Sequence, residues 1–320
     1  MSTHPSRRLL VGLLTLLALI GAACSSSDDD NGVVAGGGDD TEAPAGGDFP
    51  VTVGELTFDT APAAIVSLSA TATEILFAIS AGDQVIAVDD QSDFPEAALD
   101  VGTDLSGYTP NIEAIAAFEP DLVVAFFDDG TLEAGLTAIG IPFLLQESPA
   151  TFDDAYGQIA DLGIITGHVD EAAAVVASIR GDLADLVADA PSAEGLTYYH
   201  ELDDIFYSAT STTFVGEVYS LFGLTNIADV ADGADSGFPQ LSAEFIIDTD
   251  PSLIFLADTE CCGQNLETVR ARPGWDSITA VQDGHVIELS DDIVSRWGPR
   301  LVDFARSIAE AIASVETAGA

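Results

Sequence analysis

Two stretches decide the fold, residues 110–126 (PNIEAIAAFEPDLVVAF) and residues 240–256 (QLSAEFIIDTDPSLIFL), because they follow one plan at two places in the chain. In each stretch a glutamate, Glu113 or Glu244, stands seven residues before a proline, and an apolar run follows the proline. The second stretch therefore reads as a repeat of the first.

The repeat extends beyond these two stretches. Asn111 and Ser242 each precede the glutamate by two residues and are typical caps of a short helix. Earlier in each half, ATATEILFAI around Glu74 resembles VGEVYSLFG around Glu217, and later LTAIGIPFLLQ parallels ITAVQDGHVIEL. Three matching blocks in the same order predict two similar lobes.

Short runs rich in β-branched residues alternate with helical patterns, which favours an α/β fold with largely parallel strands. We predict two Rossmann-like lobes, 49–166 and 192–320, with a ligand cleft between them near the carboxyl ends of the strands. The predicted strands are 64–69, 84–88, 121–126, 142–146, 196–201, 252–257 and 285–289.

A single long helix over 167–191 is predicted to join the lobes, because apolar residues recur there at helical spacing and Pro191 ends the pattern. About 20 helical residues span about 30 Å, which is enough to cross from one lobe to the other. Such a stiff connection predicts only a small hinge motion. The apolar positions are Val176, Ile179, Leu183 and Leu186.

The first 23 residues have the architecture of a secretory signal, with two arginines, an apolar run and small residues before Cys24. This pattern resembles a lipoprotein signal, in which Cys24 carries the lipid, and export by the general or the twin-arginine route is left open. Residues 24–48 are rich in Gly, Ser and Asp and are predicted to form a flexible tether.

Charge excludes one class of partner. The chain has 54 acidic residues and 8 basic ones, all arginine, and a net charge of −46. Nucleic acid would be repelled by such a surface. An acid excess of this kind keeps a protein soluble and discourages self-association, so we expect a monomer.

The chain resembles a known family over about residues 50–316: the class III substrate-binding lipoproteins of ABC importers, which take up cobalamin, ferric siderophores or haem. The resemblance implies an extracytoplasmic, lipid-anchored binding protein that serves a permease dimer with a cytoplasmic ATPase. It is carried by IVSLSATATEILFAI, DDQSDFP, TPNIEAIAAFEPDLVVAF, LGI near 162 and GPRLVDF.

In that family each lobe presents a surface glutamate to arginines of the permease, and by position Glu74 and Glu217 resemble this pair. A structural alternative exists for the first of them. The sequence TATE fits a capping box in which Thr71 caps a helix and Glu74 occupies the third position.

The resemblance places four loops at the ligand cleft, and aromatic faces in such loops suit a large rigid macrocycle. Acid-rich loops would repel an anionic ferric siderophore, and few arginines lie near the cleft, so the favoured ligand is a corrinoid; a siderophore or haem is the alternative. The expected ligand contacts are Phe94, Tyr108, Phe206, Tyr207, Trp297 and Arg300.

No resident cofactor and no bare metal site are expected, since the histidines fall in separate segments. His200 is expected to face solvent at a strand end, although it could serve as an axial ligand to a chelated metal. Cys261 and Cys262 could form a vicinal disulfide or remain free thiols. No catalytic motif is present, so a secreted hydrolase and a non-delivering ligand sensor are the less favoured functions.

Overall fold

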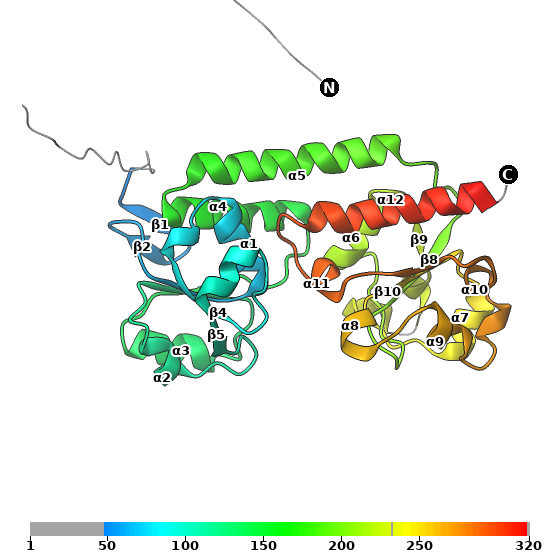
Figure 1. The fold of residues 1–320 in the computed structure, drawn as a ribbon, viewed down its shortest axis with the longest axis horizontal. Coiled ribbons are helices and arrows are strands. Elements are labelled where there is room, and N and C mark those ends of the chain that lie inside the picture. Colours follow the sequence, from blue (N-terminus) through cyan, green and yellow to red (C-terminus); the bar gives the residue numbers. More distant parts are fainter. Residues whose placement is uncertain (1–47, 232, 319–320) are drawn as a thin grey trace, which may run out of the picture. The chain divides into compact units, whose positions relative to one another are not determined.

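The computed structural model describes residues 48–231 and 233–318, and these residues form two parallel sheets, as predicted (Figure 1). The signal segment, Cys24 and all but the last residue of the predicted tether lie outside the described residues. No helix within the described ranges is both long and apolar enough to span a bilayer.

The first sheet has the strand order β5-β4-β3-β6-β7 and is parallel throughout. Its two central strands are completely buried, which explains why their sequences are continuous apolar runs rather than alternating ones. The strands are β3 (Ile65–Leu68), β4 (Val85–Asp89), β5 (Gly102–Leu105), β6 (Leu122–Ala125) and β7 (Phe143–Leu145).

The second sheet repeats this arrangement, with the order β9-β8-β10-β11 and parallel pairing. Strands β8 and β10 take the central places of β3 and β6, so the order matches that of β4-β3-β6-β7. The duplication inferred from the sequence is therefore present in the topology. The strands are β8 (Thr197–Glu201), β9 (Thr225–Asn226), β10 (Leu253–Leu256) and β11 (Val286–Glu288).

Short capped helices connect the strands of each sheet. The Asn111 side chain accepts from the Ala114 N–H, and Ser242 accepts in the same way from Phe245, so both predicted caps are confirmed. The connecting helices are α1 (Ala70–Ala78), α2 (Ile112–Ala116), α3 (Thr131–Ala138), α6 (Phe214–Ser220), α7 (Ala243–Thr249), α8 (Thr259–Cys262), α9 (Leu266–Arg270) and α10 (Thr279–Asp283). Two further helices lie outside the sheets' connections, α4 (Phe152–Thr166) between β7 and the joining helix and α11 (Asp291–Val294) after β11.

The joining helix α5 spans Val169–Asp189 and ends just before Pro191, as the sequence predicts. It runs beside α4 and beside the C-terminal helix α12 (Leu301–Ala318) (Figure 1). Its buried residues are Ala172, Ile179 and Leu183. These contacts make α5 part of one core rather than a free-standing rod.

Helix α12 closes that core. Phe304, Ile308 and Ile312 are buried, and the Phe304 ring packs edge-on against Tyr219 with 5.3 Å between ring centroids. The same apolar cluster includes residues of α1, α4, α5 and both sheets. The C-terminal helix therefore holds the chain that precedes it, residues 291–300, in a defined place.

Four small strands were not predicted. Strands β1 (Val51–Val53) and β2 (Leu56–Phe58) form an antiparallel hairpin, and the edge strands β5 and β9 are short. Each has only two to four residues, too few to show a period in the sequence.

Candidate functional site

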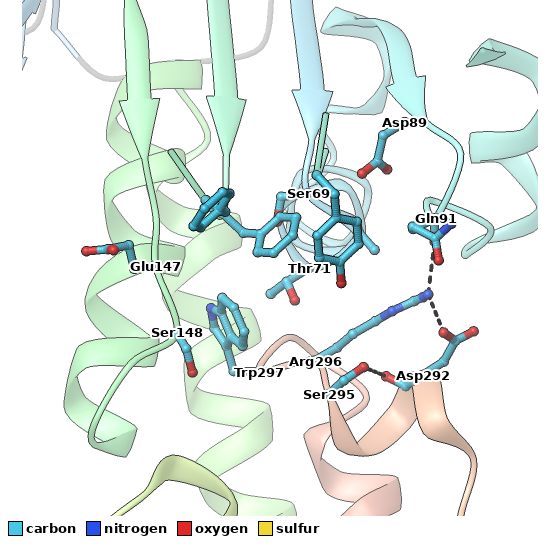
Figure 2. A pocket seen from close by; sticks show the side chains of 14 residues that line it. Ser69, Thr71, Asp89, Gln91, Glu147, Ser148, Asp292, Ser295, Arg296 and Trp297 are labelled. Carbon is cyan, nitrogen blue, oxygen red and sulfur yellow. Dashed lines mark hydrogen bonds and ion pairs between the residues drawn. The ribbon is translucent and has the colours of Figure 1, made fainter. Parts of the chain in front are cut away.

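A pocket of about 570 Å³ lies where loops at the carboxyl ends of the first sheet meet residues 292–297 of the C-terminal segment (Figure 2). Strand-end loops are the usual ligand position in parallel α/β sheets. The lining residues are Ser69, Ala70, Thr71, Asp89, Gln91, Tyr108, Phe126, Phe127, Glu147, Ser148, Asp292, Ser295, Arg296 and Trp297.

Aromatic rings contributed by two loops form the apolar part of the wall. The ring of Tyr108, which is 65% exposed, stands edge-on to Phe126 at a centroid distance of 5.0 Å, and Phe127 lies 6.5 Å from Phe126. Gly107 permits the approach of this loop, because a Cβ there would lie 2.7 Å from the Leu68 carbonyl oxygen. Exposed aromatic faces of this kind offer stacking surface to a flat ligand.

Trp297 supplies the facing aromatic wall from the loop between α11 and α12. Its Nε1–H donates to Oε1 of Gln158 on α4 over 2.6 Å. The same Gln158 amide donates from Nε2 to the Glu147 carbonyl oxygen over 2.8 Å. One glutamine therefore fixes the indole and the neighbouring strand-end loop together.

Three carboxylates line the pocket. Asp89 is 2% exposed; its Oδ1 accepts from the Ser92 hydroxyl at 2.6 Å, and burial raises the pKa of its carboxyl. Burial also raises the pKa of Asp292. Glu147, the third acid, is exposed. The pocket thus presents hydrogen-bond acceptors and negative charge.

Arg296 is the only cation among the described lining residues, and its charge is already paired. One terminal nitrogen, Nη1, donates to Glu74 and to Asp93, each at 2.9 Å. The other, Nη2, donates to the Gln91 carbonyl oxygen at 2.9 Å and lies 2.7 Å from Asp292. Each terminal nitrogen carries two hydrogens, so the four acceptors use all four of them.

The expectation that Glu74 lies on the surface is wrong. The residue is 2% exposed and is held by Arg296 and by Arg300, whose Nη2 lies 2.6 Å from Oε1 of Glu74. The capping alternative is wrong as well, because Ser69, not Thr71, caps α1. The surface expectation failed because the two arginines lie more than 200 residues further along the chain.

Glu217 differs from Glu74 in its surroundings. It is half-buried, it accepts from the Phe152 N–H at 2.8 Å, and burial raises the pKa of its carboxyl. It lines a separate groove beside Arg180 and Leu183, away from the aromatic pocket. The two glutamates therefore do not form an equivalent exposed pair.

Of the six expected ligand contacts, the pocket brings together Tyr108 and Trp297. Phe94 and Arg300 lie next to the pocket residues but outside its lining, with the Arg300 guanidinium 4.3 Å from the centre of the Phe94 ring.

Phe206 and Tyr207 are not in the pocket lining. The Phe206 ring stacks on Trp275, 5.6 Å between centroids, and Tyr207 forms an isolated antiparallel bridge with Gln240. Sequence reasoning missed Phe126, Phe127, Glu147 and Asp292. The signal for the first two was their position at the end of the predicted strand 121–126, since Phe126 is its last residue and Phe127 begins the strand-end loop.

The two adjacent cysteines are free thiols, and both are exposed on α8, so no vicinal disulfide is present. The hydrogen bond with the Cys262 thiol, together with a smaller contribution from partial desolvation, raises the pKa of Cys261 to about 12, which keeps that thiol protonated and a poor nucleophile at neutral pH.

His200 does not face solvent as expected. It is completely buried, its Nδ1 lies 2.9 Å from the Tyr219 hydroxyl, and desolvation lowers its pKa to about 3. A neutral imidazole in the core cannot reach a ligand in the pocket. No group of three or more potential metal-binding side chains occurs within residues 48–231 and 233–318.

Comparison with known proteins agrees with the fold. Residues 65–293 match the family model described as periplasmic binding protein. An uncharacterized ABC transporter substrate-binding lipoprotein of Bacillus subtilis is 29% identical, over 82% of this chain and 86% of that protein. A cobalamin-binding protein of Halobacterium salinarum is 30% identical, over 80% of this chain and 72% of its own length.

Solved structures share the architecture. The crystal structure named as an ABC-type Fe3+-hydroxamate transport system from Saccharomonospora viridis superposes with a TM-score of 0.65 and 25% identity. The match covers 82% of this chain and 99% of the other. Relatives with this fold therefore carry names that refer to different metal chelates.

Proposed function

This chain belongs to the periplasmic binding protein family, and we propose that it is the extracytoplasmic solute-binding component of an ABC importer that captures a corrinoid. The ligand lies in the pocket between the first sheet and residues 292–297, and the protein hands it to a permease without making or breaking a bond. A ferric siderophore or haem is the alternative ligand.

One observation carries the choice of a corrinoid: the pocket combines aromatic faces with carboxylates and has no unpaired cation among its described lining residues. Tyr108, Phe127 and Trp297 offer flat apolar surface. Asp292 and Glu147 offer acceptors to the amide side arms of a corrinoid. An anionic siderophore or the propionates of haem would instead meet negative charge, which costs affinity in a site of low dielectric.

Tryptophan fluorescence tests this choice, because the chain has 2 tryptophans and they occupy different places. Trp297 lines the pocket, whereas Trp275 is buried in apolar core packed against the second sheet. Purified protein is titrated with cyanocobalamin, haemin and a ferric hydroxamate. Saturable quenching by cyanocobalamin that disappears in Trp297→Phe is the expected result; saturation by haemin or the hydroxamate with silence toward cyanocobalamin would overturn the corrinoid.

Docking on the permease is assigned to a different acidic pair from the one that the sequence favoured. Glu113 and Glu244 occupy the same position in the repeat, two residues after the caps of α2 and α7, and both are exposed. One acid per lobe suits a permease with two-fold symmetry.

The docking proposal is tested by reversing both charges, Glu113→Lys with Glu244→Lys, and by measuring uptake and ligand binding separately. Loss of uptake with unchanged binding supports docking through this pair. Retained uptake would exclude it. Loss of uptake would also exclude a ligand sensor, because uptake does not depend on a protein that only binds ligand.

The secretory signal, which resembles a lipoprotein signal, supports a location anchored to the membrane. A lipid on Cys24 would hold the protein at the outer face of the membrane, and a tether of about 24 residues would let it reach the permease. Replacement of Cys24 by Ala, followed by fractionation of cells into membrane and soluble material, tests the anchor. Protein that stays with the membrane after this change would contradict it.

A further inference from the structure

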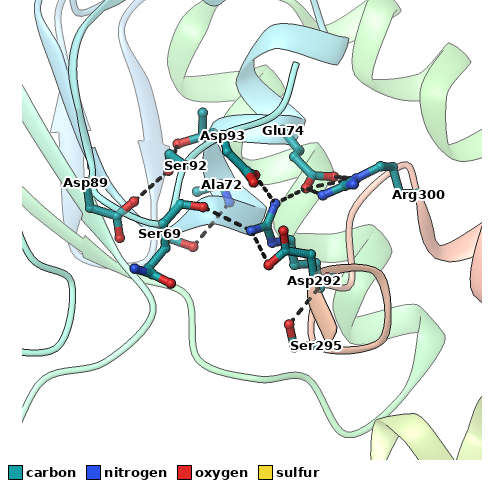
Figure 3. A network of polar contacts seen from close by, with 12 residues as sticks. Ser69, Ala72, Glu74, Asp89, Ser92, Asp93, Asp292, Ser295 and Arg300 are labelled. Atoms are coloured by element: carbon teal, nitrogen blue, oxygen red, sulfur yellow. Dashed lines mark hydrogen bonds and ion pairs between the residues drawn. The ribbon is translucent and has the colours of Figure 1, made fainter. Parts of the chain in front are cut away.

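Figure 3 shows the buried carboxylate of Glu74 in a network of polar contacts that reaches residues of the pocket lining, among them Asp292. We infer that Glu74 is a charge-selectivity determinant of the ligand pocket, acting through Arg296: it occupies the guanidinium that would otherwise receive an anionic ligand. The inference deepens the proposed function, since it rests on this pocket being the ligand site.

Geometry places Arg296 between Glu74 and the pocket. Its side chain lines the cavity and is 6% exposed, while Glu74, which does not line the cavity, lies behind it. The carboxylate of Glu74 is fixed from its other side, because Arg300 donates from Nε to both oxygens at 3.1 Å and from Nη2 to Oε1 at 2.6 Å. A carboxylate held in this way has one orientation.

The partners of Arg296 differ in how strongly water screens them. The side chains of Asp93 and Asp292 are 55% and 33% exposed, whereas that of Glu74 is 1% exposed. Solvent and salt weaken the two outer pairs much more than the inner one. Glu74 is therefore the partner that keeps Arg296 neutralised under ordinary ionic conditions.

The balance of charges around Arg296 favours the same interpretation. Three carboxylates, those of Glu74, Asp93 and Asp292, share two guanidinium groups, those of Arg296 and Arg300. Removing the Glu74 charge would leave two cations against two half-exposed acids, so the positive charge of Arg296 beside the pocket would be compensated only by acids that water screens. A carboxylate of a ligand could then pair with Arg296.

The test uses two ligands with the same macrocycle, haemin and its dimethyl ester, in which methylation removes the charge of both propionates. The change in the ratio of their dissociation constants between wild type and a variant reports charge selectivity. Wild-type protein is expected to prefer the ester. In Glu74→Gln we expect the ratio to move toward haemin by about tenfold or more, the effect of one charge-assisted hydrogen bond. An unchanged ratio would overturn the inference.

Two further variants separate selectivity from a loss of folding. Glu74→Gln with Arg296→Gln should return the ratio to the wild-type value, because the freed cation is gone. Asp292→Asn, which alters a half-exposed partner of the same guanidinium, should shift the ratio in the same direction by a smaller factor. A double variant that keeps the full shift would show that Arg296 does not mediate it.

The matched control is Glu171→Gln, which removes an exposed acid from the first turn of α5 and should leave the ratio unchanged. A shift of equal size in this control would mean that net charge, not Glu74, sets the preference, and would overturn the inference. Failure of cyanocobalamin to bind would overturn the corrinoid proposal but not this one, because the ratio is measured within the porphyrin pair.

Discussion

The indole nitrogen of Trp297 donates to the side-chain oxygen of Gln158 over 2.6 Å, and this bond joins residues 139 positions apart. It ties the loop before α12 to α4 and aligns the tryptophan with the pocket. The wall of the site therefore depends on a contact between the end of the chain and its first lobe.

We expect Gln158→Leu to weaken ligand binding about fivefold, because the indole N–H of the buried Trp297 loses its acceptor and the ring loses its fixed orientation. Quenching of Trp297 fluorescence measures the change. Gln282→Leu, at an exposed glutamine on α10, is the control and should bind as wild type does. Equal affinity in both variants would show that the bond does not orient the ring.

Stability should depend on pH through Asp258, whose pKa is raised to about 7 by burial and by the charge of Glu201. Glu201 itself is held by Arg272 through two bonds of 2.5 and 2.6 Å. Between about pH 4 and pH 7 the unfolded chain ionises Asp258 while the folded protein keeps it protonated, so stability falls as pH rises and levels off above pH 7.

Asp258→Asn should remove this dependence and raise the free energy of unfolding at pH 8 by on the order of 2 kcal/mol relative to wild type. Urea unfolding at pH 5 and pH 8 measures the difference. Asp248→Asn, an exposed acid on α7, is the control and should keep the wild-type slope. Identical slopes in wild type and Asp258→Asn would contradict the assignment.

Replacement by alanine should change the stability in opposite directions at two glycines, one on the joining helix α5 and one on α4, which packs against it. A Cβ at Gly181, in the middle of α5, meets nothing within 4 Å, so Gly181→Ala should stabilise the protein by about 0.5 to 1 kcal/mol. A Cβ at Gly163, on α4, would lie 2.4 Å from the Cβ of Ala172. Gly163→Ala should therefore destabilise by about 1 to 3 kcal/mol.

Thermal or urea unfolding of the two glycine variants checks both signs in one experiment. Destabilisation by Gly181→Ala would mean that α5 is strained there. An unchanged free energy of unfolding in Gly163→Ala would mean that α4 and α5 can move apart without cost.

The two lobes should move little relative to each other when ligand binds, because the joining helix α5 shares its core with α4 and α12. Small-angle scattering of ligand-free and ligand-saturated protein should give the same radius of gyration within error. A clear decrease on ligand addition would show a closure that the stiff connection does not allow.

The strands and the linking helix could be predicted because each has a local cause: a buried apolar run for β3 and β6, and helical spacing that ends at Pro191 for α5. The pairing of Glu74 with Arg296 could not, because no local pattern links residues 222 positions apart. Phe206 and Trp297 both looked like cleft aromatics, and only packing decided that the first stacks on Trp275 while the second faces the pocket.

The path of α12 has a consequence for biosynthesis. A nascent chain that has emerged only as far as β11 already contains every strand of both sheets, yet it lacks Arg296 and Trp297 and leaves Glu74 without its cations. Residues 292–297, which complete the pocket, are therefore made after every strand of the two sheets. A tag or reporter inserted between β11 and α12 would therefore silence capture while sparing most of the fold.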